Sequence, residues 1–136
     1  MYQLTYISTA NGLAIGDVDQ ILMISRRNNS RDSVTGLLVY DGVRFLQALE
    51  GERSCVEAAF ARIKLDPRHR AAVVLSRRDV EARQFGNWAM AAEQAAAIKG
   101  AASVPQIVDA LVLSVPDANT RALFSSFARL DRRRSA

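Results

Sequence analysis

"VTGLLVYDGVRFLQALEG", residues 34–51, decides the fold, because a turn signal divides it into two apolar runs. Branched and aromatic side chains dominate residues 34–40 and 43–50, as is typical of strands. Between the runs, Asp41 and Gly42 form a dipeptide that strongly favours a two-residue hairpin. The second run is apolar on both faces, which predicts a strand at the centre of a sheet.

Gln47 is the exception within this central strand. It lies on the same face as Phe45 and Leu49, while Leu46 and Ala48 occupy the other face. A buried carboxamide that lacks hydrogen-bond partners costs roughly 1–3 kcal/mol. Gln47 is therefore either a core residue satisfied by the backbone or a residue that contacts a ligand.

A helix is expected on each side of the hairpin. The first begins near Val18 and is broken by the segment 28–33, and one of its faces carries Val18, Ile21, Leu22, Ser25, Asn28 and Asn29. The second begins at a capping box formed by Ser54 and Glu57, and Pro67 ends it. Its apolar stripe consists of Val56, Ala59, Phe60 and Ile63.

Three further strands complete the pattern, at residues 2–8, 71–80 and 87–92. The resulting order, β-α-β-β-α-β-β, places two crossover helices around a hairpin. This order predicts an α+β sandwich of the ferredoxin-like type, with both helices on one face of the sheet.

The opposite face of this sheet also needs a cover, because its side chains are too apolar to remain in water: Leu37, Val39, Leu46 and Ala48. Residues 104–114 and 117–131 both have amphipathic helical patterns, and Leu123, Phe124 and Phe127 form the apolar side of the second. We expect these C-terminal helices to cover their own sheet, a partner's sheet, or both. The predicted division is a domain over 1–95 and a helical extension over 96–136.

The composition limits the protein's class. A chain of 136 residues is long enough to form one domain with one hydrophobic core. Its content of 49% hydrophobic and 24% charged residues is ordinary for a soluble globular protein. The single cysteine excludes an internal disulfide and fits a reducing cytoplasm, and with one histidine it cannot build a zinc site of the usual kind. No apolar run approaches ~18–20 residues, and no basic segment opens the chain, so we expect neither a membrane span nor a signal peptide.

The net charge of +4 comes partly from a run of arginines at 132–134. Such a run can contact nucleic acid, but no aromatic residues are interleaved with it. We therefore interpret it as a solvated end of the last helix and expect no nucleic-acid partner.

The candidate chemistry lies in polar groups on apolar faces, since no familiar catalytic motif is present. Tyr6 and Gln47 are expected on adjacent central strands, both facing the groove between the helices. Asn28 and Asn29 end the first helix beside that groove. An apolar groove with a few convergent polar groups is the usual form of a small-molecule site.

The other candidate residues are less distinctive. His69, the only histidine, lies in the polar stretch "DPRHR". We interpret it as a surface or phosphate-contacting residue, because a general base needs a positioned nucleophile beside it. Trp88 and Met90 share a face of the last strand, where such a pair usually belongs to the core.

The sequence resembles the BLUF domain, a blue-light sensor that uses flavin. The segments that carry the resemblance follow the family's order and spacing over residues 2–92: "LTYIS", "SRRNNSRDSVTGLLVYDG", "FLQALEG", "RIKLDPRH" and "RQFGNWAM". The resemblance implies the ferredoxin-like fold with a flavin between the two helices. The flavin is FAD in most of the family, and FMN and riboflavin are the alternatives.

The resemblance also implies roles for individual residues. Tyr6 matches the photoactive tyrosine, Gln47 the glutamine between it and the flavin ring, and Trp88 and Met90 the pair associated with signal transmission. Together with Gln47, the positions implied to bind the flavin are Ile21, Ser25, Asn28, Asn29, Leu38, Arg62, Ile63, Asp66, Arg68 and His69.

These residue types suit flavin photochemistry. Branched side chains such as Ile21 and Ile63 fill the faces of a flat ring, and the amides of Asn28 and Asn29 can pair with its polar edge. Tyrosine can give up an electron together with its phenolic proton. The amide of Gln47 can rotate or tautomerise without moving charge, so by this interpretation Gln47 is buried because it is the switch.

The sequence therefore predicts a non-enzymatic blue-light receptor with no metal. We expect a homo-oligomer, a dimer or larger, that acts on a separate effector protein; by resemblance, the effectors are cyclic-dinucleotide phosphodiesterases or response-regulator-like proteins. Two alternatives stay open. One is a small hydrolase like the acylphosphatases, and the other is a ligand-binding or assembly module that is not photoactive.

Overall fold

The structure is a computed structural model that describes residues 1–11, 17–40, 43–85, 89–94, 109, 112–113 and 115–129. For residues 18–19 and 89–94 it describes the backbone alone. The hairpin dipeptide at 41–42, Trp88 and most of the expected helix at 104–114 lie outside the described residues. None of the helices described is long and apolar enough to cross a membrane.

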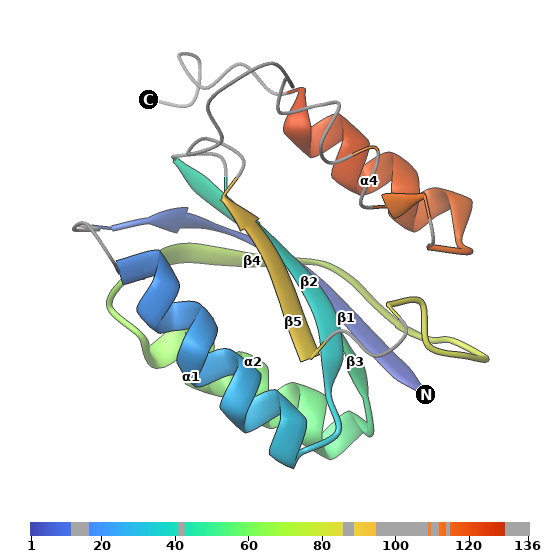
Figure 1. Ribbon diagram of the computed structural model, residues 1–136, viewed down its shortest axis with the longest axis horizontal. Coiled ribbons are helices and arrows are strands. Elements are labelled where there is room, and N and C mark those ends of the chain that lie inside the picture. Colours follow the sequence, from blue (N-terminus) through green and yellow to red (C-terminus); the bar gives the residue numbers. More distant parts are fainter. Residues whose placement is uncertain are drawn as a thin grey trace.

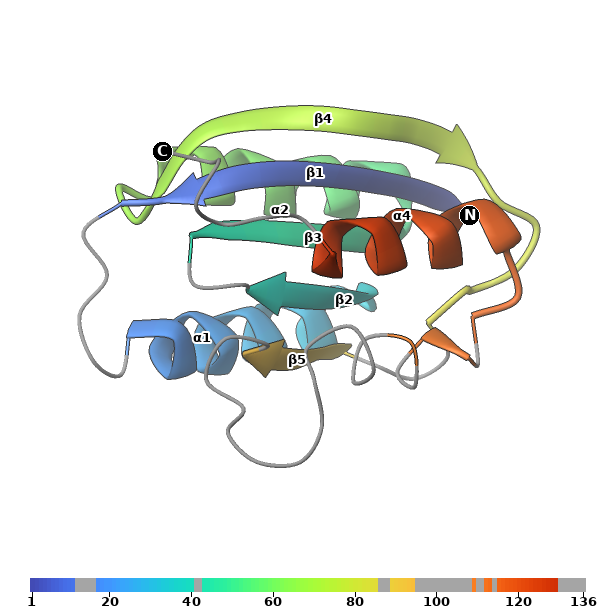
Figure 2. The same ribbon diagram turned by 90° about the horizontal axis from the view of Figure 1, so that it is seen from above.

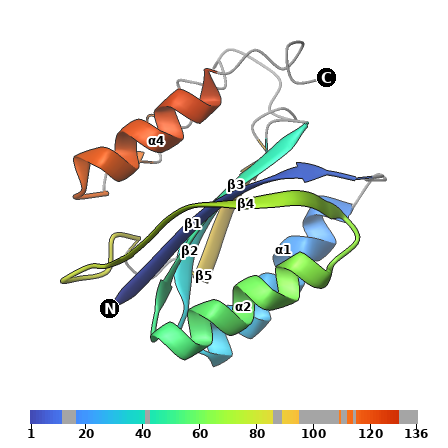
Figure 3. The same ribbon diagram turned by 180° about the vertical axis from the view of Figure 1, so that it is seen from behind.

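A five-stranded sheet separates two helices from a third (Figure 1). The elements, in chain order, are β1 (Tyr2–Ala10), α1 (Asp17–Arg31), β2 (Thr35–Tyr40), β3 (Arg44–Gly51), α2 (Arg53–Leu65), β4 (His69–Asp79), β5 (Ala89–Gln94) and α4 (Ala118–Ala128). Figure 3 shows α1 and α2 on one face and α4 on the other. The predicted ferredoxin-like α+β fold is confirmed.

The strand order is β4-β1-β3-β2-β5, so β3 is the central strand as predicted. Figure 2 shows this order, with α4 in front of the sheet and α1 and α2 behind it. The pairs β1–β3, β1–β4 and β2–β3 are antiparallel, and β5 joins β2 as a parallel edge strand.

The central strand supplies both hydrophobic cores. Phe45 and Leu49 pack with α1 and α2, whereas Leu46 and Ala48 pack on the opposite side with Phe124 of α4. Both faces of β3 are therefore buried, as the apolar residues on its two faces predicted.

The C-terminal helix covers the chain's own sheet. The apolar side of α4, with Leu123, Phe124 and Phe127, packs on the cluster that contains Leu37 and Val39. Val112 and Val115 join the same cluster. The far face of the sheet is thus covered by α4 of the same chain, while most of 104–114 lies outside the described residues.

The predicted length of the hairpin connection was wrong. A two-residue loop at 41–42 would pair Tyr40 with Val43, but the register pairs Tyr40 with Phe45. The two rings stack with centroids 4.7 Å apart, and this contact accompanies the longer connection. A shift by two residues leaves every side chain on its predicted face.

The predicted capping box was also wrong. Helix α2 begins at Arg53, and its N-cap, Glu52, makes no side-chain cap hydrogen bond. Instead, the Ser54 hydroxyl donates to Glu52 Oε1 at 2.9 Å. Glu57 accepts hydrogen bonds from the Tyr2 hydroxyl at 2.5 Å and from Arg77 Nε at 3.1 Å. These tertiary partners engage the carboxylate that a capping box would need.

The end of α1 differs from the prediction as well. Asn28 and Asn29 lie inside the helix, which continues to Arg31. The positive backbone angle that follows, φ 56°, belongs to Ser33. The two asparagines therefore do not cap the helix, and their carbonyl groups accept from Asp32 N at 3.0 Å and Val34 N at 2.8 Å.

Candidate functional site

A pocket opens between α1, α2 and the sheet. Its volume is about 140 Å³, and its lining combines apolar and polar side chains from four parts of the chain: Ile21, Ile24, Ser25, Asn28, Asn29, Gln47, Leu49, Ala59, Arg62, Ile63, Asp66, Arg68 and His69. Every position that the resemblance assigned to flavin binding lies in this lining except Leu38. Leu38 is buried in the core beneath, paired with Gln47 across β2 and β3.

Three lining residues were not predicted: Ile24, Leu49 and Ala59. Each lies one structural period from a predicted position, since Ile24 follows Ile21 by one helical turn and Leu49 follows Gln47 on the same face of the strand. The periodicity that identified their neighbours could have found them.

The polar centre of the site is a pair across β1 and β3. Tyr6 lies directly opposite Gln47, and both side chains are buried. The Tyr6 hydroxyl donates a hydrogen bond to Gln47 Oε1. Gln47 lines the pocket and Tyr6 does not, so the amide of Gln47 is the group through which Tyr6 reaches the pocket.

The surroundings of Tyr6 keep its phenol neutral. Burial raises the pKa of Tyr6, and the negative charge of Asp66 raises it further. The ring packs against Phe60 with centroids 5.1 Å apart and against His69 at 6.3 Å. Because the phenol stays protonated, its O–H group can donate the hydrogen bond to Gln47.

His69, interpreted from the sequence as a surface or phosphate-contacting residue, lines the pocket. Its ring is half-buried and packs on Phe45 with centroids 4.6 Å apart, and its Nδ1 lies 2.8 Å from the Ser8 hydroxyl. Burial lowers the pKa of His69, although the charge of Asp66 opposes this effect. The imidazole is thus part of the aromatic packing beside Tyr6.

Two arginines of the lining differ in how firmly they are held. Arg68 forms a forked ion pair with Asp66, with Nη2 2.8 Å from Oδ2, and lowers the pKa of that carboxyl. It also donates to Gln20 at 3.2 Å. Arg62 contacts Asp32 at 3.6 Å and is more exposed. Arg62 is therefore freer to turn toward an incoming anion.

The residue types around the pocket fit a flavin. Aliphatic side chains from both helices can cover a flat ring, while the buried Asn29 and Gln47 offer amide groups to its edge. The volume is below the ~300–1,000 Å³ of most ligand sites. Among the described residues, no group of His, Cys, Asp and Glu could hold a metal ion.

The two remaining photoactive candidates are not placed at the site. Trp88 lies outside the described residues, and for Met90 the structure describes only the backbone, within β5. Their role in transmitting a signal stays a prediction.

A family model described as sensors of blue-light using FAD (BLUF) matches residues 1–91. The chain belongs to the BLUF family. This membership confirms the resemblance seen in the sequence, and it also confirms the expectation of a flavin-based sensor family with FAD as its cofactor. A BLUF domain is a sensor and is not itself a catalyst.

Solved BLUF structures share the fold. BlrP1 of Klebsiella pneumoniae superimposes with a TM-score of 0.80 at 25% identity, over 93% of this chain and 32% of that one. BlrB, in its dark state, has a TM-score of 0.67 at 36% identity and covers 69% of this chain and 72% of that one. One of the BlrP1 structures contains FMN and cyclic diGMP.

Curated relatives are much longer proteins. The blue light- and temperature-regulated antirepressor BluF of Escherichia coli (strain K12) is 36% identical over 73 residues, or 54% of this chain and 18% of the relative. The photoactivated adenylate cyclase subunit beta of Euglena longa is 32% identical over 89 residues, 64% of this chain and 10% of the relative. This chain thus spans less than a fifth of either relative.

Proposed function

We propose that this protein is a blue-light receptor that binds FAD without a covalent bond in the pocket between α1 and α2. It catalyses no reaction and passes a conformational signal to a separate effector protein. The observation that carries the proposal is the hydrogen bond from the buried Tyr6 hydroxyl to Gln47 Oε1, at the wall of the pocket.

In this proposal, each group of residues in the pocket lining has a different role in binding the flavin. Ile21 and Ile63 cover the faces of the ring, and the amides of Asn28 and Asn29 pair with its polar edge. The charged side chains of Arg62 and Arg68 would attract the phosphate tail, and Asp66 holds Arg68 in an ion pair. When bound, the flavin supplies blue-light absorption and an electron acceptor.

Tyr6 and Gln47 perform the switching step. Tyr6 supplies an electron and its phenolic proton, and Gln47 Oε1 is the first atom positioned to receive that proton. Once the electron and the proton have both returned to Tyr6, the Gln47 amide would be left rotated or tautomerised, with its donor and acceptor groups exchanged. The hydrogen-bond network then differs although no net charge has moved.

The same proposal extends to the whole chain. Residues 1–95 are the flavin-binding sensor, and 96–136 are a helical extension that serves as cap, oligomer contact or signal output. The protein works in the cytoplasm as a homo-oligomer. The relatives support a role in signalling to an effector, because their names pair the domain with an antirepressor and with a cyclase, although there the matched domain is a small part of a longer chain.

The test compares Tyr6→Phe and Gln47→Leu with the unchanged protein. All three should be yellow and release flavin on denaturation, because neither substitution removes the apolar cover of the ring. Blue light should shift the flavin absorption band to the red in the unchanged protein only. A normal red shift in either variant contradicts the assignment of the switch.

Tyr2→Phe is the matched control. Tyr2 lies on the same strand and the same face as Tyr6, and it is also buried, but its hydroxyl donates to Glu57. Its loss should leave the red shift intact. A colourless purified protein would contradict flavin binding itself and would favour the ligand-binding or assembly module.

A further inference from the structure

Glu50 is a fully buried carboxylate on the far side of the sheet from the pocket. It lies three residues after Gln47 on β3 and on the opposite face. Its Oε1 accepts hydrogen bonds from the Thr35 hydroxyl at 2.9 Å and from Phe85 N at 2.8 Å, and its Oε2 accepts one from Gln84 N at 2.8 Å. A buried carboxylate with three donors is held firmly.

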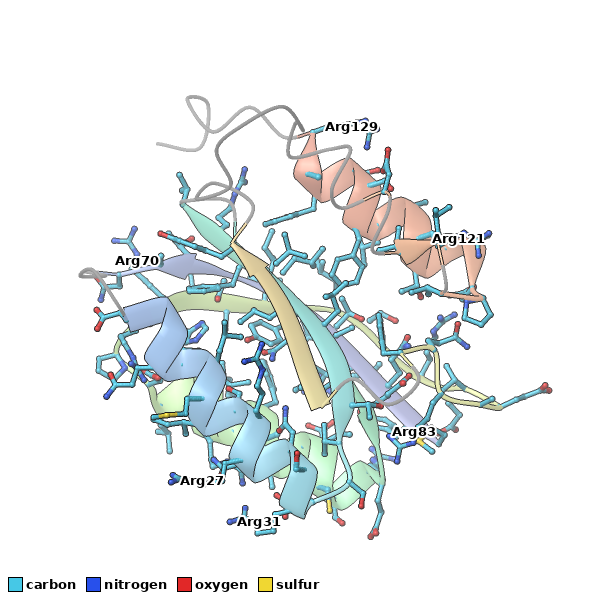
Figure 4. The ribbon with its side chains drawn as sticks, in the orientation of Figure 1. Arg27, Arg31, Arg70, Arg83, Arg121 and Arg129 are labelled. Atoms are coloured by element: carbon cyan, nitrogen blue, oxygen red, sulfur yellow. The ribbon has the colours of Figure 1, made fainter. Side chains whose placement is uncertain are left out.

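Two of these donors are backbone groups of the segment that follows β4. Arg83 fixes the same segment to the sheet, since its Nη1 donates to the Thr35 hydroxyl at 2.7 Å and its Nη2 donates to the Ser33 carbonyl at 2.8 Å. Figure 4 shows Arg83 at the end of the sheet, on the same side of the molecule as Arg121 of α4. The segment is therefore attached to the ends of β2 and β3.

The segment held by Glu50 is also attached to α4. Gln84 Oε1 accepts a hydrogen bond at 2.8 Å from the backbone N of Asp117, which is the N-cap of α4. The buried ring of Phe85 packs edge-on against Phe124 of α4, with centroids 6.2 Å apart. A continuous chain of contacts thus leads from β3 to the C-terminal helix.

We propose that Glu50 is a positioning residue that couples β3 to α4, so that a light signal reaches the C-terminal helix without passing through β5. This inference rests on the proposed function, because the signal begins at Gln47. The route consists of the Glu50 carboxylate, the backbone of residues 84–85, and the two contacts that this segment makes with α4.

The geometry suits this role. Three residues of extended strand place Glu50 about 10 Å from Gln47 along β3. A strand buried on both faces and bonded on both edges moves as a unit, so a change in the bonds of Gln47 displaces Glu50 with it. Coupling follows if the contacts to α4 have different free energies in the dark and in the light.

Two substitutions in the full chain test the route. Glu50→Gln keeps the shape but points an amide NH₂ at one of the backbone N–H donors, and Gln84→Met keeps all three Glu50 bonds but loses the acceptor for Asp117 N. Glu52→Gln is the control, because this exposed neighbour accepts only from Ser54 among the side-chain bonds described. The measurements are the red shift and the hydrogen exchange of residues 117–128 in dark and light.

Both variants should keep the red shift of the unchanged protein. In the dark, exchange in the first turn of α4 should be about tenfold faster, and the light-minus-dark difference over 117–128 should be smaller than in the unchanged protein. The Glu52→Gln control should match the unchanged protein in every measurement. Gln84→Met keeps the test decisive if Glu50→Gln does not fold.

Two results would overturn the coupling. One is an unchanged light-minus-dark difference in both variants. The other is loss of the red shift in Glu50→Gln, because Glu50 would then act on the pocket itself. A missing red shift in the unchanged protein instead contradicts the proposed function, and with it any light-dependent coupling.

Discussion

At the scale of single residues, the proton of Tyr6 determines which way the Gln47 amide points. A neutral phenol donates, so the amide oxygen of Gln47 faces Tyr6. Burial and the charge of Asp66 both raise the pKa of Tyr6. The two effects together keep the phenol protonated and fix the dark orientation of the switch.

This raised pKa predicts how the photocycle depends on pH. A free tyrosine ionises near pH 10, whereas the raised pKa moves the ionisation of Tyr6 to higher pH. The red shift should therefore keep its full amplitude from pH 7 to about pH 10. Light-minus-dark spectra at one-unit steps measure this. A loss of amplitude with an apparent pKa below 10 would show that Tyr6 is not shielded in this way.

Single residues also show how far the sequence could identify the site. Tyr6 and Gln47 were visible as polar groups on apolar faces, but their roles came from the resemblance. For His69, the polar neighbours in the sequence do not indicate that its ring packs on Phe45. Glu50 was missed because its donors at 84 and 85 are distant in the sequence and no local pattern predicts them.

At the scale of elements, β2 and β3 approach each other closely at Gly36. A Cβ added to Gly36 would lie 2.0 Å from the carbonyl oxygen of Ala48, so only glycine fits where these strands pair. The sequence predicted both strands from their apolar residues. It did not predict how near their backbones approach, which depends on the pairing itself.

Gly36→Ala should therefore be strongly destabilising, by about 3 kcal/mol or more, because the backbone of β2 or β3 must move. The measurement is the free energy of unfolding by urea, with flavin content as a second readout. Gly51→Ala is the comparison, since its added Cβ would lie 3.1 Å from the Ser33 carbonyl oxygen and should cost less. An equal effect at both positions would contradict the argument.

Element boundaries show where local signals fail. Apolar periodicity predicted α2 correctly, but the capping box failed because Tyr2 and Arg77 engage Glu57. The Asp-Gly dipeptide predicted a tighter connection than the observed register, in which the Tyr40 and Phe45 rings stack. In both cases a contact between distant or opposing residues accompanies the departure from the local preference.

The sheet divides the whole molecule into a flavin side and an output side, and a signal must cross it to reach α4 (Figure 3). The sequence predicted this division from the two apolar faces of β3. It left open which sheet the C-terminal helix covers, because amphipathicity shows that a helix needs a partner and does not identify it.

Met90→Ala tests the other route across the molecule, through β5. The strand leads toward the C-terminal helices, so this substitution should leave the red shift nearly intact and weaken the light-dependent change over 96–131 or in oligomer state. Light-minus-dark hydrogen exchange and size-exclusion elution in each state are the measurements. An unchanged response would mean that the signal leaves the pocket without β5.

A double variant, Met90→Ala with Glu50→Gln, distinguishes a single signalling route to α4 from two independent routes. If the β5 route and the Glu50 route are independent, each single substitution removes part of the light-minus-dark difference in α4, and their effects add. If both residues belong to one path, the double variant loses no more than the more severe single variant. Additive losses would support two separate connections between the flavin face and α4. Non-additive losses would mean that Glu50 acts by holding the segment that leads into β5.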